Sequence, residues 1–167
     1  MPRLRGEKFP VNQQVEYTEE ELQTLREAVL TSGIAVVMCE FTLISTPIEV
    51  ATLAKELMKA AKKHPHNQLI QTLFGEAAGK KQSKQTNQEI KVTAENALEI
   101  AIAQINQAIA ILQQKVTPEE IQAYKEFIYA CAERVANAAG EGLLGTGEKV
   151  SQKEAATLNQ LKTALNL

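Results

Sequence analysis

Four Ser/Thr-x-x-Glu sequences constrain the fold of this chain more than any other feature. In such a capping box, the hydroxyl of the first residue accepts the third helical N–H, and the glutamate accepts the N–H of the capping residue. The four boxes begin at Thr18, Thr46, Thr117 and Ser151. Proline follows the cap in two of them, at the first helical position, where its missing donor costs nothing. Helix starts this frequent predict a chain made of several helices.

Apolar residues recur at helical spacing after these starts. Leu98, Ile102, Ile105, Ile109 and Leu112, for example, alternate by four and three and form one apolar stripe. No segment alternates with the period of two that a strand requires. The spacing predicts helices over 18–39, 46–63, 67–79, 87–114, 118–139 and 152–165. The start of the helix over 87–114 is taken from Thr86-Asn-Gln-Glu89, with Thr93 as the alternative.

These elements predict an all-α protein, a six-helix bundle in a single domain over residues 17–167. Residues 1–16 contain two prolines and three basic residues without any period. We therefore expect them to form an extended or mobile N-terminal arm.

Composition excludes several classes of function. All 20 acidic residues are glutamate, so the EF-hand loop and the Ser-His-Asp triad are excluded. The net charge of −2 gives no global field for nucleic acid or an anionic membrane. The longest apolar stretch, Ile34–Ile44, is interrupted by Glu40 and falls short of the roughly 18 residues of a transmembrane segment. Cys39 and Cys131 lie in apolar surroundings without ligand spacing, which is typical of buried free thiols in a cytoplasmic protein.

The second and fourth capping boxes belong to similar sequences. Glu49-Val-Ala-Thr-Leu53 aligns with Glu154-Ala-Ala-Thr-Leu158, and capping does not dictate the shared Ala, Thr and Leu. Each half then consists of a long helix, a loop carrying a glutamate, and a shorter capped helix. We interpret this as an internal duplication of helical hairpins, with Leu53 and Leu158 both facing the core.

The second half carries a resemblance to a known family. It contains Val135-Ala-Asn-Ala-Ala-Gly-Glu-Gly142 at the end of a helix, then Ser151-Gln-Lys-Glu154 and a helix to Leu165. This pattern resembles the tellurite-resistance TerB-like family. The resemblance covers residues 118–165 and, with fewer matching positions, residues 17–63.

The resemblance implies an internally duplicated, all-helical, cytoplasmic protein linked to tellurite or general chemical stress, with no established catalytic reaction. In the family, metal binding is suspected at an acidic residue of the loop in each half. By position this acid corresponds to Glu141 and, less directly, to Glu40. The chain departs from the family by carrying glutamate in place of the usual aspartate, and by a longer second loop rich in glycine.

Three further motifs favour no specific chemistry. Gly140-Glu-Gly-Leu-Leu-Gly145 matches the dinucleotide fingerprint, but a helix precedes it where that fingerprint needs a strand, so no dinucleotide is expected. His64-Pro-His66 has no third metal ligand nearby in sequence. The lysines that flank the helix over 67–79 suit a solvated edge or an acidic partner better than nucleic acid, because aromatic residues for stacking are missing. They are Lys59, Lys62, Lys63, Lys80, Lys81 and Lys84.

Two hypotheses of function follow. The first is a non-enzymatic TerB-like module in stress response, acting by binding a partner protein, by self-association, or by binding a divalent metal ion at Glu141 and Glu40. No cofactor beyond that candidate metal ion is expected. The alternative is an enzyme or small-molecule sensor whose pocket lies between the two hairpins and uses Glu40 and Glu141.

Overall fold

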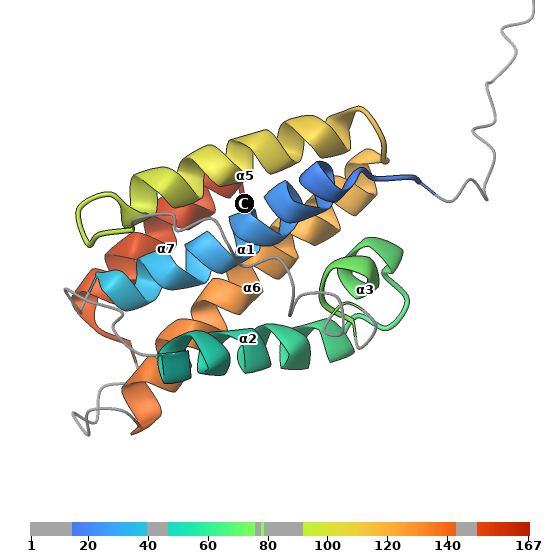
Figure 1. The fold of residues 1–167 in the computed structure, drawn as a ribbon. Coiled ribbons are helices and arrows are strands. Elements are labelled where there is room, and N and C mark those ends of the chain that lie inside the picture. The colour runs from blue at the N-terminus through green and yellow to red at the C-terminus, as the bar shows by residue number, and fades with distance from the viewer. Residues whose placement is uncertain (1–14, 40–46, 76–77, 79–91, 143–149) are drawn as a thin grey trace, which may run out of the picture.

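The computed structural model describes residues 15–39, 47–75, 78, 92–142 and 150–167 of the chain. Within these ranges the protein is all-α, with no strand (Figure 1). Its helices are α1 (Glu19–Met38), α2 (Pro47–Lys62), α3 (Gln68–Phe74), α5 (Ala97–Gln113), α6 (Pro118–Gly142) and α7 (Gln152–Leu165). For the described residues, the predicted all-α class and six helices are confirmed.

Three of the predicted capping boxes form. The Thr18 N–H donates to Glu21 Oε2 at 2.8 Å, and the Glu21 N–H donates to Thr18 Oγ1 at 3.2 Å. Ser151 and Glu154 repeat both bonds at 2.8 and 3.1 Å, and Thr117 and Glu120 do so at 3.1 and 3.3 Å. The box at Thr46 lies outside the described residues.

Three predicted boundaries were wrong. The predicted helix over 87–114 begins only at Ala97, because the Asn96 side chain accepts the Thr93 N–H at 2.7 Å and stabilises a turn ahead of it. Helix α3 ends at Phe74, short of residue 79, because Gly75 is extended. Helix α6 continues past residue 139 to Gly142. The box at Thr86 lies outside the described residues.

The core forms around α1, which runs beside α5 and crosses α6 (Figure 1). Tyr124 of α6 is fully buried, and its hydroxyl donates to the Leu25 carbonyl of α1 at 2.7 Å. Burial raises the pKa of the Tyr124 phenol well above its ordinary value. This bond fixes the start of α6 against α1.

A glycine lies where α1 crosses α2. A Cβ added to Gly33 would lie 2.7 Å from Leu53 Cδ1 and 3.6 Å from Val135 Cγ2. Leu53 and Leu158 are 7% and 6% exposed and belong to the same core cluster, so the prediction that both face the core is confirmed.

The predicted burial of the two thiols is confirmed for Cys131 and is wrong for Cys39. Cys131 is a buried free cysteine, and burial raises the pKa of its thiol to about 12. Cys39, at the end of α1, is of intermediate exposure, and its thiol donates to the Val36 carbonyl at 2.9 Å. None of the described helices has the length and apolar character needed to cross a membrane.

Candidate docking groove

A groove of about 660 Å³ opens where the starts of α1 and α6 meet α3. Its apolar lining comes from four separate segments of the chain: Val15, Tyr17 and Leu22 from the first, then Leu69, Ala78 and Val116. Val15 is 38% exposed, which is unusual for a large apolar side chain in the described part of this protein. The volume lies within the range of about 300–1,000 Å³ typical of binding sites.

Glutamates dominate the charge of the groove lining. Glu16, Glu19 and Glu120 line it, and Arg26 is the opposing cation among the described lining residues. Glu19 and Glu120 stand in the first turns of their helices, where acidic groups offset the helix dipole. Glu16 precedes α1, so helix stabilisation does not explain its position. The groove is therefore apolar inside and negatively charged at its edge.

The groove walls are tied together by specific bonds. Arg26 Nε of α1 donates to the Leu73 carbonyl of α3 at 3.3 Å. Lys115 Nζ donates to the Glu16 carbonyl at 2.9 Å and pairs with Glu21 Oε2 at 2.7 Å. These bonds join segments far apart in sequence, so the groove belongs to the folded scaffold.

Tyr17 lies at the centre of these interactions. Lys115 Nζ stands 5.3 Å from the centre of its ring, in a cation–π contact. Partial burial, followed by the charges of Glu120 and Glu21, raises the pKa of the Tyr17 phenol from 10.0 to about 12. The Tyr17 phenol therefore stays neutral at physiological pH beside the glutamates at the edge of the groove.

This pKa shift predicts a loss of stability at alkaline pH. The folded protein holds the Tyr17 proton more tightly than the unfolded chain, so the stabilisation is complete below pH 10.0 and is lost as pH rises toward about 12. Tyr17→Phe should reduce this loss in chemical denaturation curves recorded from about pH 9 to about pH 12. The remaining loss comes from Cys131 and Tyr124, whose pKa values burial also raises. Tyr129→Phe, outside the groove, is the control, and an unchanged profile in Tyr17→Phe would contradict the prediction.

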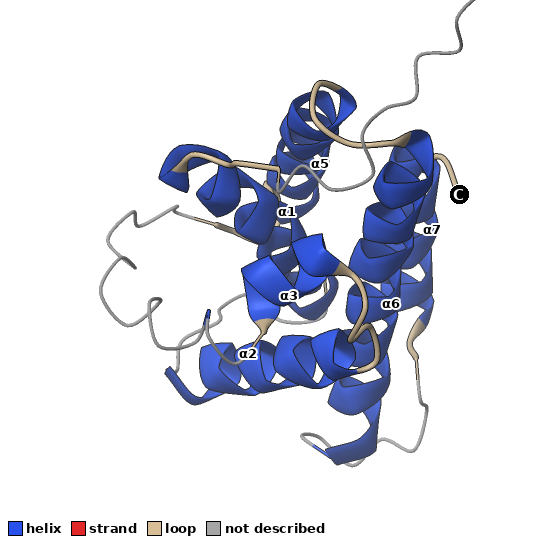
Figure 2. Cartoon of the chain, turned by 90° about the vertical axis from the view of Figure 1, so that its right-hand side faces the viewer, coloured by secondary structure: helices blue, strands red, loops and turns tan. Residues whose placement is uncertain are grey.

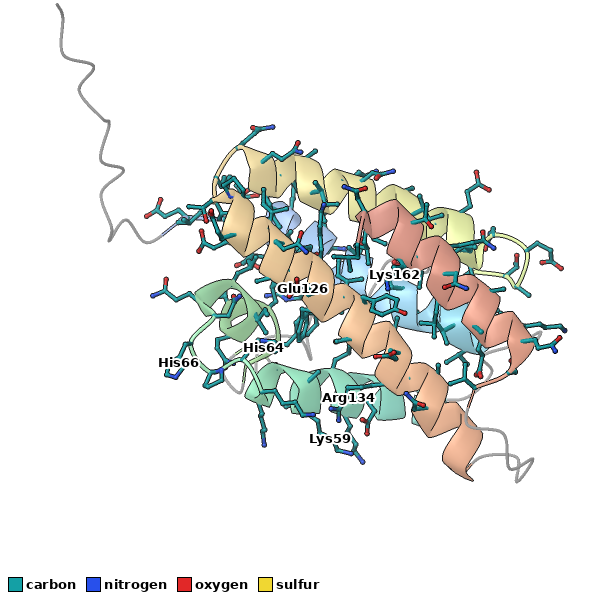
Figure 3. All side chains as sticks on the ribbon, turned by 180° about the vertical axis from the view of Figure 1, so that it is seen from behind. Lys59, His64, His66, Glu126, Arg134 and Lys162 are labelled. Carbon is teal, nitrogen blue, oxygen red and sulfur yellow. The ribbon has the colours of Figure 1, made fainter. Side chains whose placement is uncertain are left out.

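A second charged cluster joins α2 to α6 (Figure 3). Glu56 of α2 pairs with Lys59 at 2.6 Å and with Arg134 of α6 at 3.3 Å. Lys59 and then Arg134 hold the pKa of the Glu56 carboxyl below its usual range, against the opposing effect of burial. Arg134 Nε is buried without a hydrogen-bond partner. This cluster positions α2 and leaves its outer lysines exposed.

The histidine pair has a structural contact. The His64 ring meets the Phe127 ring edge-on, with centres 5.6 Å apart, while His66 is exposed (Figure 3). In the part of the chain that the structure describes, no three potential ligands among His, Cys, Asp and Glu gather to hold a metal ion.

The side chains of the two predicted metal residues, Glu141 and Glu40, lie outside the described residues. Glu141 lies in the last turn of α6. The groove stands at the opposite ends of α1 and α6. The fingerprint glycines Gly140 and Gly142 close α6, and the rest of that motif is outside the described residues.

The metal hypothesis makes its own prediction. A cation that binds only the folded state raises its stability by about 2.7 kcal/mol at a hundredfold excess over Kd. Thermal melts in millimolar Mg²⁺, Ca²⁺ or Zn²⁺ should then shift upward, and Glu141→Gln should remove the shift. Glu133→Gln, two turns earlier on α6, is the matched control. A melting temperature unchanged by all three cations would contradict a site at Glu141.

Sequence reasoning missed the groove, although its parts were visible. Tyr17 and Val116 precede predicted caps, where an apolar residue commonly packs onto the following helix. The sequence does not show that the starts of α1 and α6 both meet α3.

Comparisons of the chain with family models, curated proteins and solved structures give no match.

Proposed function

We propose that this protein is a non-enzymatic helical binding module that docks a partner protein in its acid-edged groove. The observation that carries the proposal is the groove itself, with an apolar interior lined by Val15 and Leu22 and an edge formed by glutamates. Apolar grooves with charged edges are a common means by which one protein receives a segment of another.

The arrangement of the groove supports docking in two ways. Tyr17 supplies an amphipathic ring, a residue type enriched where proteins bind one another. Because Arg26 and Lys115 fix the walls, binding requires little ordering of the groove, which lowers its entropic cost.

The TerB-like interpretation remains part of the proposal. It assigns the module to a cytoplasmic response to tellurite or chemical stress, built from two duplicated hairpins. The shared burial of Leu53 and Leu158 supports the alignment on which the duplication is based. Loss of the protein should then increase sensitivity to tellurite, and the wild-type chain should restore growth where a Glu16→Lys, Glu19→Lys variant does not.

A photo-crosslinking experiment tests the docking function. A photoreactive amino acid at Val15 should give a discrete adduct in cells, identified by its mass and peptides, because Val15 is exposed within the groove. The same group at Asn106, exposed on α5, is the control. The Glu16→Lys, Glu19→Lys variant should lose the Val15 adduct. No adduct at Val15, or the same adduct at both positions, would overturn the proposed function.

A further inference from the structure

The outer face of α2 carries a pattern opposite to that of the groove. Lys55, Met58, Lys59 and Lys62 follow one another at spacings of three, one and three residues and are all exposed. Residues at i, i+3, i+4 and i+7 share one side of a helix. The face therefore presents Met58, 38% exposed, among three lysines. We call these four residues the lysine face.

The lysine face and the groove are complementary in both charge and apolar character. Val15 and Met58 are the exposed large apolar residues of the described chain, each 38% exposed. Val15 stands beside Glu16 and Glu19, whereas Met58 stands beside lysines. Opposite potentials around apolar centres favour association and set its orientation. The groove and the lysine face therefore form two complementary surfaces on the same chain.

Helix α3 holds the two surfaces in a fixed relation. Gln71 lines the groove, and its side-chain amide donates to the Ala61 and His64 carbonyls at the end of α2, at 2.8 and 3.0 Å. In Figure 2, α3 lies between α1 and α2. Because the two surfaces flank the same short helix, a two-fold arrangement of two copies can join both pairs of surfaces at once.

We propose that the partner received by the groove is a second copy of this chain, whose lysine face binds there. The inference rests on the proposed docking function and names its partner. Met58 of one copy packs against Val15 and Leu22 of the other, while Lys55 approaches Glu16 and Glu19. Lys59 contributes less to the attraction, because Glu56 already neutralises it.

Sedimentation equilibrium of the full chain tests the pairing. We expect a monomer–dimer equilibrium that strengthens with protein concentration, up to about 1 mM for a weak contact. Raising the salt concentration from about 0.05 M to about 0.5 M should weaken it, because the attraction between exposed charges is screened. A monomer at every concentration and salt would overturn the inference.

Charge reversal identifies the surfaces. Lys55→Glu and Glu19→Lys should each be monomeric alone, because each places like charges together. An equimolar mixture should dimerise, since the acidic face of one variant meets the basic groove of the other, and the native face meets the native groove. Restoration in the mixture also shows that both variants fold.

Lys153→Glu on α7 and Glu99→Lys on α5 are matched controls, both exposed and outside the two surfaces, and should dimerise as the wild type does. Dimerisation unchanged by Lys55→Glu and Glu19→Lys would overturn the inference. If the chain is monomeric while Val15 crosslinks to another protein, the second copy is excluded and the docking function stands. If Val15 also gives no adduct, both proposals fail.

Discussion

Replacing Phe127 with alanine should lower the free energy of unfolding by about 3–5 kcal/mol, the range for truncation of a buried phenylalanine. Phe127 of α6 is fully buried. Its ring centre lies 5.7 Å from that of Phe74 in α3 and 5.6 Å from that of His64 after α2. Truncation would leave a cavity where α6, α3 and the turn after α2 meet. Chemical denaturation curves give the change directly.

His64→Ala is the control for this prediction. It removes one of the same ring contacts from an exposed position, so we expect a change within about 1 kcal/mol. Equal costs in the two variants would contradict Phe127 as the anchor of this junction.

The fold class was predictable because local signals agreed with one another. Thr18 and Ser151 cap their helices through residues three positions away, so these helix starts can be predicted from neighbouring residues. The predicted helix boundary was wrong where a side chain outside these motifs determines it, as at the start of α5. The side-chain Oδ1 of Asn96 accepts the Thr93 N–H, and α5 begins only after this turn, although the apolar period predicted an earlier start.

The groove was not predictable because its walls meet only after folding. Lys115 and Glu21, which fix one wall, are 94 positions apart in the sequence. Neither residue belongs to a motif from which its pairing with the other could be predicted. Its glycine neighbours made Glu141 a candidate in the sequence, whereas the glutamates that line the groove lie at the starts of α1 and α6.

Leu53→Ala and Leu158→Ala should each lower the free energy of unfolding by about 2–5 kcal/mol, as for other buried leucines. Both side chains lie in the core at equivalent places of the proposed repeat. A cost below about 1 kcal/mol for either variant would contradict the alignment of the two halves. Denaturation curves with unchanged slopes would show that stability alone has changed.

The packing of Leu53 can also be tested through Gly33, because the two residues approach each other at the crossing of α1 and α2. Gly33→Ala in the wild-type chain adds a Cβ 2.7 Å from Leu53 Cδ1, and this clash opposes the gain in helix propensity of about 1 kcal/mol. In the Leu53→Ala background the clashing atom is gone, so Gly33→Ala should stabilise the protein by about 1 kcal/mol. The free energy of unfolding of the double variant should therefore be higher than the two single changes predict when added, as a double-mutant cycle measures.

Ser32→Ala, at the preceding buried position of α1, is the control, and its effect on the free energy of unfolding should add to that of Leu158→Ala. Strict additivity of Gly33→Ala with Leu53→Ala would contradict the close packing of α2 on α1, and with it the first of the two proposed hairpins.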